Sequence, residues 1–406
     1  MTGKAPKGWE VARLDKLADI SSGVTKGRKL GSAETVTLPY LSVANVQHGF
    51  LDLTEVKSIE VKVDEVERYR LQRDDVVLTE GGDPDKLGRG TLWRDEIPVC
   101  LHQNHIFRVR CDDIRLLPAY FAAYLLSLEA RTYFLRSAKQ TTGIASINMT
   151  QLRGLPVRFP DTAKQARIVA TLAKADSLRA QRERSLALLD DLLRSAFVEM
   201  FGDPASNPKS YTRMPLGHLL AVPPRIGTTR PASDEGDVPV IRVGEIGGDD
   251  IPLARCGRVT VSDSEYQRYR CHPGDLLLAR AIGSADHLGK ATVFPCSSER
   301  VVFDSHVMRL RTNTERLLGA FLLHWLRSTG GRSLFLQQGG RTAVQFNINA
   351  KQIAGLPINL PPIDHQRRYA ALVERVGSQR RLVLKSQREA SSLTSTLLHR
   401  AFRGEL

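Results

Sequence analysis

The chain has 406 residues, of which 42% are hydrophobic and 25% are charged, an ordinary composition for a globular protein of two to four domains. It contains no run of eighteen apolar residues and no apolar region near its N-terminus, which argues against a membrane span and against secretion. Lys and Arg exceed Asp and Glu by 14, so we expect a polyanionic partner, either nucleic acid or an anionic membrane surface. The alternative is a basic protein without such a partner.

The five cysteines are odd in number and form no Cys-x-x-Cys pair. This usage predicts neither disulfides nor a structural zinc site, and a reducing cytoplasm is the expected location.

Taken in chain order, the first 160 residues alternate short apolar runs with turns. Strands are predicted at Tyr40–Val43, Val76–Thr79 and Ile106–Val109. A helical stretch follows at Leu117–Arg136, with one apolar face formed by Tyr120, Tyr124, Leu125 and Leu128. This pattern is typical of an α+β domain.

The next segment, Lys164–Phe201, contains neither Pro nor Gly and predicts a helix of about 37 residues, roughly 55 Å long. A narrow apolar seam with helical spacing is formed by Ile168, Leu172, Ala175, Leu186, Leu189, Leu193 and Ala196. Because such a rod cannot fit within one small domain, it needs a partner. The turn-rich segment Gly202–Pro208 ends it.

The second half of the chain repeats the first. Leu38–Val43 aligns with Val238–Val243 at an offset of 200, and His105–Arg110 aligns with His306–Arg311 at an offset of 201. The repeat continues through a second rod at Asp364–Phe402, whose seam is formed by Tyr369, Val373, Val376, Val383, Ala390, Leu393 and Leu397. Toward the rod ends the offset becomes 205, which indicates four extra residues in one rod.

We therefore predict an α+β protein with two repeated α/β domains, separated by two long helices that pair as an antiparallel coiled coil with pseudo-twofold symmetry. The predicted boundaries are 1–160 for the first domain, 161–203 for the central helix, 204–361 for the second domain and 362–406 for the C-terminal helix.

The framework repeats, whereas the polar loops differ between the copies. Ser21–Arg28 has an unlike counterpart in Pro224–Arg230, and Glu80–Lys86 stands where the second copy has Arg280–His287. A constant scaffold with variable basic loops is typical of a recognition protein. The loop residues that we predict to contact DNA are Lys26, Arg28, Lys29, Asn45, Gln47, His48, Lys86, Arg89, Thr141 and Thr142 in the first copy, and Arg225, Arg230, Arg242, Arg280, His287, Lys290 and Arg341 in the second.

Arg can pair with guanine, Asn and Gln with adenine, and Lys serves mainly phosphates. For each residue taken singly, a solvated surface side chain is the competing interpretation.

Motifs for catalysis are missing from the sequence. It contains no phosphate-binding Walker motif, no His-Glu-x-x-His, no Gly-x-Ser-x-Gly and no Asn/Asp-Pro-Pro-aromatic signature of amino-methyltransferases. The sequence therefore predicts no catalytic residues and no metal ligands.

Three groups of residues keep two interpretations each. The recurring His105 and His306 are either structural or contact a phosphate or base. The acidic loop of Glu80, Asp83 and Asp85 is either solvated or binds a metal. The arginines of the seam either set the register of the rods or are solvated. They are Arg179, Arg182 and Arg380.

Several phrases resemble one family, the specificity subunits of type I restriction-modification systems. They are Trp9–Ser21, Gly143–Asn148 running on to Leu155-Pro156 and Gln165, Asn349, Leu356–Pro362 with Gln366, and Ala401–Leu406. The resemblance covers nearly the whole chain. It departs from the family pattern at the helix starts, where Lys164-Gln165 and His365-Gln366 replace Glu-Gln.

The resemblance implies a non-catalytic DNA-binding subunit with two target recognition domains, each reading half of a bipartite, asymmetric site. Two conserved helices would pair antiparallel and fix the gap between the half-sites. Two methyltransferase subunits, which hold S-adenosylmethionine and methylate adenine at N6, would dock on this subunit, and restriction subunits would join where the system has them.

Two other classes of function remain as alternatives. One is a stand-alone nucleic-acid enzyme, against which the missing motifs argue. The other is a tandem-repeat protein that bridges protein partners without binding DNA.

Overall fold

We analysed a computed structural model, which describes residues 6–82, 87–141, 144–233, 235–248, 251–282, 289–338, 340–341 and 346–406. The chain divides into two compact units, Met1–Gln181 with Ser386–Leu406, and Arg182–Lys385. Each long helix contributes part of its length to each unit, so each unit contains more residues than the predicted domains 1–160 and 204–361.

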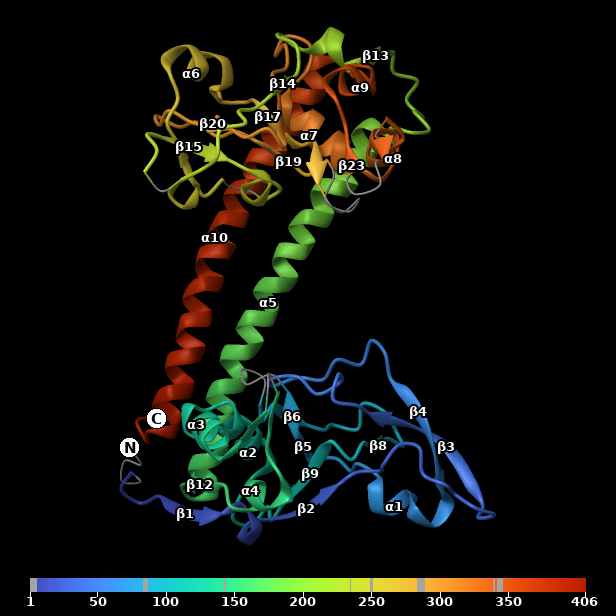
Figure 1. The fold of residues 1–406 in the computed structure, drawn as a ribbon, viewed down its shortest axis with the longest axis vertical. Coiled ribbons are helices and arrows are strands. Elements are labelled where there is room, and N and C mark those ends of the chain that lie inside the picture. The colour runs from blue at the N-terminus through green and yellow to red at the C-terminus, as the bar shows by residue number, and fades with distance from the viewer. Residues whose placement is uncertain are drawn as a thin grey trace. The chain divides into compact units, whose positions relative to one another are not determined.

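In the first half of the chain the elements are β1 (Glu10–Arg13), β2 (Ala18–Ser22), β3 (Thr35–Leu41), β4 (Lys57–Lys62), α1 (Val66–Tyr69), β5 (Val76–Thr79), β6 (Gly81–Gly82), β7 (Gly90–Leu92), β8 (Leu101–His102), β9 (Ile106–Cys111), α2 (Pro118–Leu125), α3 (Leu128–Ser137), β10 (Lys139–Thr141), β11 (Ile144–Ser146), α4 (Met149–Arg153), β12 (Pro156–Phe159) and α5 (Thr162–Phe201) (Figure 1).

In the second half they are β13 (Arg213–Pro215), β14 (Arg225–Ile226), β15 (Val238–Ile241), β16 (Arg258–Val259), α6 (Asp263–Tyr269), β17 (Leu276–Ala279), β18 (Ala281–Ile282), β19 (Ala291–Val293), β20 (Val302–Phe303), β21 (Val307–Leu310), α7 (Gly319–Arg327), α8 (Thr329–Gln338), β22 (Gly340–Arg341), β23 (Phe346–Asn347), α9 (Ala350–Ala354), β24 (Pro357–Asn359) and α10 (Ile363–Phe402).

The sheets of the two halves have matching strand orders. β2-β9-β5-β7 corresponds to β14-β21-β17-β19, β4-β3-β8 to β16-β15-β20, β6-β11-β10 to β18-β23-β22, and β1-β12 to β13-β24. The pairs β3–β8 and β15–β20 are parallel, at equivalent places. The predicted α+β class and the internal repeat are therefore confirmed, and we call the two copies module 1 and module 2.

One inner strand of each four-stranded sheet, β5 in module 1 and β17 in module 2, is buried on both faces. In β5, Val76 and Leu78 belong to the core that includes α2, whereas Val77 belongs to the core beneath β3 and β8. This explains why β5 is an uninterrupted apolar run rather than an alternating one. The loops that begin and end at these strands are thereby held on a rigid base.

The helical stretch predicted at 117–136 is two helices rather than one. Ser127 ends α2 and caps α3, because its side chain accepts a hydrogen bond from the Ala130 amide. The change of direction turns Leu128 outward, where its side chain is 63% exposed, while Tyr120, Tyr124 and Leu125 are buried. The predicted common face was therefore wrong for Leu128.

The two predicted long helices are confirmed, each with 40 residues. In the first unit, Ile168 near the start of α5 shares a core with Phe402 at the end of α10. In the second unit, Phe197 near the end of α5 packs on Tyr369 near the start of α10, and the Tyr369 hydroxyl donates to the Leu193 carbonyl at 3.0 Å. The helices therefore pair antiparallel within each unit.

The apolar seam is buried only toward the helix ends. Ile168, Leu172 and Tyr369 are buried, but Leu186 and Leu189 are half-buried. Leu393 was wrongly placed in the seam, since its side chain is 51% exposed. Farther along the helix pair in the second unit, a polar contact joins α10 to α5, because Arg380 Nη1 donates to Asp190 Oδ1 at 2.6 Å. This contact supports the register interpretation of Arg380.

A buried glutamine fixes the start of each long helix. Gln165 is fully buried, and its amide donates to the Arg115 and Pro160 carbonyls and accepts from the Leu117 amide. Gln366 makes the equivalent bonds in module 2, to Arg316, Pro361 and Leu318. The contacts at the helix starts therefore come from the glutamines, and the departures from the family pattern at Lys164 and His365 leave them intact.

Candidate nucleic-acid interface

The first candidate loops, Ser21–Arg28 in module 1 and Pro224–Arg230 in module 2, each leave the four-stranded sheet at a glycine. A larger residue at this glycine would force the neighbouring backbone to move. A Cβ atom on Gly23 would lie 1.8 Å from the His102 carbonyl oxygen, and one on Gly227 would lie 2.1 Å from the Phe303 carbonyl oxygen. The next residue then bonds to the same neighbouring strand, with the Val24 and Thr228 amides donating to these two carbonyls at 2.8 and 2.9 Å. The loops are therefore anchored at equivalent points.

In module 1, Arg28 is clamped by internal contacts. Its Nη1 and Nη2 donate to the two carboxylate oxygens of Glu65 at 2.9 and 2.8 Å, and its guanidinium lies 5.7 Å from the centre of the Tyr69 ring. The hydrogen bonds to Glu65, and the weaker interaction with Tyr69, raise the pKa of Arg28. These contacts favour a structural role for Arg28 in holding its loop.

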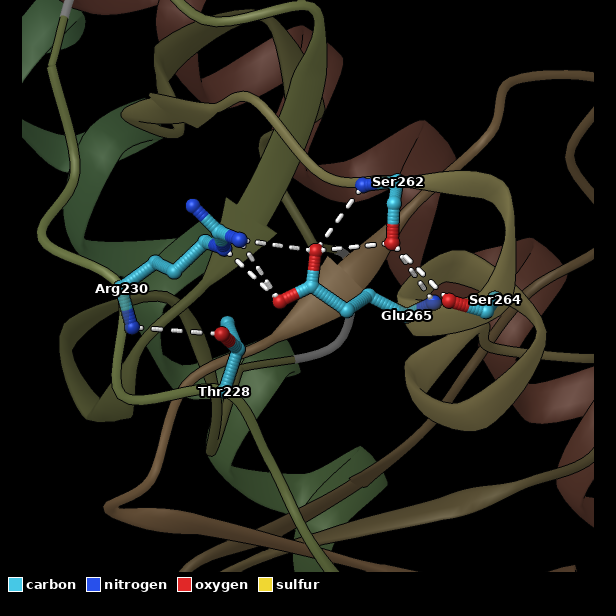
Figure 2. Close-up of polar contacts among 5 residues, drawn as sticks. All are labelled: Thr228, Arg230, Ser262, Ser264 and Glu265. Atoms are coloured by element: carbon cyan, nitrogen blue, oxygen red, sulfur yellow. Dashed lines mark hydrogen bonds and ion pairs between the residues drawn. The ribbon is translucent and has the colours of Figure 1, made fainter.

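In module 2, the equivalent arginine is Arg230, whose Nε and Nη2 donate to Glu265 at 2.9 and 3.0 Å. Figure 2 shows the guanidinium facing the carboxylate through one side. Glu265 also completes a capping box with Ser262 at the start of α6. The hydrogen bonds from Arg230 and then from the Ser262 amide lower the pKa of Glu265 to about 2. The pair is therefore ionised at neutral pH.

The side-chain amide of Asn45 makes all of its hydrogen bonds within its own loop. It is 2% exposed, its oxygen accepts from the amide and hydroxyl of Ser42, and its nitrogen donates to the carbonyls of Asp52 and Glu55. These four bonds fill the capacity of a side-chain amide. Asn45 therefore has no donor or acceptor left for a base, and we exclude it from the residues proposed to read bases.

Gln47 and Arg89 lie together, with Arg89 Nη1 donating to Gln47 Oε1 at 2.6 Å. His48 follows on the exposed part of the same loop. Partial burial, and then the positive charges of Arg131 and Arg89, lower the pKa of His48, so this histidine is neutral at pH 7. The structure thus brings three of the predicted residues of module 1 into one neighbourhood.

The residues at matching positions 80 and 280 have opposite charges. Glu80 accepts from His105 Nδ1 at 2.7 Å, whereas Arg280 donates to the Ser305 carbonyl at 2.8 Å and to Asn347 Oδ1 at 2.9 Å. Burial lowers the pKa of Arg280. With the bond from Nε to the Ile348 carbonyl at 3.4 Å, its three hydrogen bonds to neighbouring strands and loops favour a structural role.

The recurring histidines are exposed rather than buried in the core. His105 is 56% exposed and His306 54%, and each has a carboxylate beside Nδ1, with Asp304 at 3.3 Å from His306. In His105 the second ring nitrogen, Nε2, lies 3.5 Å from Asn104 Nδ2, whereas in His306 the described residues give Nε2 no partner. The two interpretations of these residues both stay open.

The remaining described residues of the predicted set are peripheral. Lys26, Lys29, Arg225 and Arg242 are exposed, and Lys290 is half-buried. Thr141 and Arg341 lie on the edge hairpins, in β10 and β22. Lys86, Thr142 and His287 fall outside the described residues, as do Asp83 and Asp85 of the acidic loop.

Module 2 has a hollow of about 180 Å³ beside Arg230. Its lining includes Thr228, Thr229, Arg242, Asp304 and His306. The first candidate loop and the segment before β21 thus meet around one small polar cavity.

The sequence interpretation missed the acidic partners, Glu65 and Glu265. Both were detectable, since they repeat at the 200-residue offset and each follows a candidate arginine loop. Among the described residues, no group of three His, Cys, Asp or Glu side chains could hold a metal ion. The same part of the chain contains no helix apolar and long enough to cross a membrane.

Comparison with known proteins gives one consistent result. Residues 6–187 match the family model of the type I restriction modification DNA specificity domain. The StySPI specificity subunit of Salmonella potsdam is 24% identical over 426 aligned residues, covering 100% of this chain and 90% of that protein. The EcoKI specificity subunit of Escherichia coli K12 is 22% identical over 434 residues, with the same coverage.

Solved structures share the fold. A chain from a study of complex assembly and conformational transition in a type I R-M system aligns with a TM-score of 0.60 at 17% identity, covering 99% of this chain and 100% of that one. The type I restriction-modification S subunit of M. genitalium aligns with a TM-score of 0.55 at 13% identity, covering 99% and 98%. Residues 6–187 therefore match the type I restriction modification DNA specificity domain, and the whole chain resembles the specificity subunits of type I restriction-modification systems, whose solved structures share its fold.

Proposed function

We propose that this chain is a specificity subunit of a type I restriction-modification system and that it reads a bipartite, asymmetric DNA sequence, with one half-site recognised by each module. The observation that carries the proposal is the duplication itself: eight sheets in four matching pairs hold loops whose side chains differ between the modules. Equal scaffolds supply equal geometry, and unequal loops supply different base preferences. An excess of 14 positive charges supports binding to a polyanion through release of counterions.

The proposal assigns chemistry to partners. Two methyltransferase subunits would bind this chain and hold S-adenosylmethionine for adenine N6 methylation, and restriction subunits would join them where the system encodes one. The chain's own contribution is to choose the DNA sequence and to position these subunits. The missing catalytic motifs and the relatives' names support this division of labour.

The test is a module swap. Replacing residues 213–350 by the corresponding segment of a relative with another specificity should change one half of the enriched DNA sequence and leave the other half unchanged. The measurement is selection from a random duplex library by the full-length chain. Changes in both halves would contradict independent modules.

The same preparation separates the alternative functions. Methyl transfer or cleavage by the isolated chain would support a stand-alone enzyme. Duplex binding that does not weaken as salt rises would oppose a role in DNA binding, because counterion release makes that weakening unavoidable.

A further inference from the structure

Arg230 is both rigidly held and open to solvent. Its side chain is 51% exposed, although Nε and Nη2 are bonded to Glu265. Its own amide donates to Thr228 Oγ1 at 3.2 Å, next to the anchored Gly227. Both the backbone and the guanidinium are therefore fixed before any ligand arrives.

The edge of the guanidinium that remains free has a defined geometry. Glu265 occupies the side edge, formed by Nε and one hydrogen of Nη2, so the end-on edge of Nη1 and Nη2 has no partner among the described residues. In Figure 2 one guanidinium nitrogen points away from Glu265. This edge can donate two parallel hydrogen bonds, which is the pattern that guanine accepts at O6 and N7.

The surroundings favour a base over a phosphate. Glu265 balances the charge of Arg230, and Asp304 opposes the charge of Arg242 in the same hollow, so an incoming phosphate would meet little net positive charge. A neutralised guanidinium retains its directional hydrogen bonds but loses most of its attraction for an anion. A phosphate contact would not need this rigid support.

Module 1 provides the contrasting case. Arg28 donates to Glu65 through its end-on edge, formed by Nη1 and Nη2. Its guanidinium also lies against Tyr69, and its side chain is only 26% exposed. At the position equivalent to Tyr69, Tyr269 packs edge-on against Phe303 instead. The same Arg–Glu pair thus closes a loop in module 1 but leaves a donor edge available in module 2.

We propose that Arg230 is a specificity-determining residue that reads a guanine in the half-site of module 2, and that Glu265 is the positioning residue that fixes its orientation. This inference rests on the proposed function, because it assumes that module 2 faces DNA. It goes further by naming the residue, its chemistry and the base.

The experiment selects bound sequences from a random duplex library with the full-length chain and its variants. In Arg230→Gln we expect a guanine preference at one position of one half-site to fall by about 10-fold or more, with all other positions retained. Arg230→Lys keeps the charge but lacks the fork, and should lose the same preference. Glu265→Gln should weaken that preference partly, at the same position.

Two controls match these changes. Arg300→Gln removes the same charge from another module 2 arginine, which is 53% exposed and pairs with Asp263 through Nη2 at 3.0 Å, and should leave the guanine preference unchanged. Arg28→Gln removes the module 1 counterpart and should leave the guanine preference in the half-site of module 2 unchanged. Equal thermal midpoints for the Arg230 variants and wild type show that any lost preference is not due to unfolding.

The outcomes separate this inference from the proposed function. If the wild-type chain enriches no sequence, the proposed DNA recognition fails. If wild type enriches a bipartite site and Arg230→Gln enriches the same bases equally well, the assignment of Arg230 is overturned while the proposed function stands. Uniform weakening across all sequences, with a shallower salt dependence, would identify a phosphate contact and would also overturn it.

Discussion

Asp75 and Asp275 are buried carboxylates at equivalent positions, each held by one arginine. Asp275 accepts from Arg311 Nε and Nη2 at 2.7 and 2.8 Å and from the His272 amide at 2.7 Å. Asp75 does the same with Arg110 and Gln72. Both are at most 1% exposed, so their charge depends on these bonds. Asp75 and Asp275 therefore tie the turn before β5 or β17 to the end of the neighbouring strand, β9 or β21.

Asp275→Asn should lower the free energy of unfolding by about 2–4 kcal/mol, because it leaves Arg311 without its charged partner and places an amide where two donors converge. The control is Asp364→Asn, whose carboxylate is 74% exposed beside Arg367 and should cost less than about 0.5 kcal/mol. Urea unfolding followed by the fluorescence of buried Trp325 measures both. Equal midpoints for the two variants would refute the structural role of Asp275.

His102 and His324 are neutral, buried histidines. Burial lowers the pKa of each to about 4, since a charged imidazole would lose its hydration. His102 bonds to the Tyr69 carbonyl through Nδ1 at 2.8 Å, and the ring of His324 lies 5.3 Å from that of Tyr369. Neither side chain faces the proposed DNA interface.

These shifts predict a loss of stability in mild acid. Below pH 6.5 the unfolded chain binds a proton at each histidine, whereas the folded chain does so only near pH 4, so stability falls as pH drops through this window. Between pH 7.5 and 5 the loss is about 2 kcal/mol per histidine. His324→Gln should flatten the decline of urea midpoints over this range, whereas exposed His365→Gln should not. Identical slopes would contradict the assignment.

At the scale of elements, the long helices depend on what holds their first turns. Gln165 and Gln366 each satisfy two carbonyls and one amide in the segment that precedes α2 or α7 and at the proline before the long helix. Each module is therefore fastened to its long helix by one buried side chain. The apolar contacts of Ile168 and Tyr369 follow one turn later.

Replacing Gln366 by Ala should lower the free energy of unfolding by roughly 2–3 kcal/mol, because three buried backbone groups lose their partner. The adjacent His365→Ala, at an exposed position, should change it by less than about 0.5 kcal/mol. Hydrogen exchange of the Leu318 amide is the local measurement. Unchanged protection in Gln366→Ala would show that the glutamine is dispensable.

At the scale of the whole molecule, α5 and α10 are continuous helices that each contribute residues to both compact units. A helix has a fixed rise per residue, so inserted residues add a fixed length to each long helix. We infer that helix length sets the number of bases between the half-sites.

Inserting seven residues after Arg182 in α5 and seven after Lys385 in α10 lengthens both helices by about 10 Å while preserving the apolar repeat. The enriched DNA site should then gain about three base pairs between its halves, with both half-site sequences unchanged. Inserting the same seven residues after Ser298, in an exposed bend of module 2, should not change the gap. An unchanged gap in the lengthened chain would contradict the ruler.

Sequence periodicity and the internal repeat were enough to predict the two modules, the two long helices and the family resemblance, because all three arise from local spacing that recurs along the chain. Tertiary structure decided what individual side chains do. Asn45 and Arg280 looked like base readers but are bonded within their modules. Leu128 faces solvent because the Ser127 cap begins a new helix, and Leu393 is exposed on α10. The difference between Arg28 and Arg230 also depends on tertiary contacts, since identical residue types at equivalent positions present different edges once Tyr69 and Glu265 are in place.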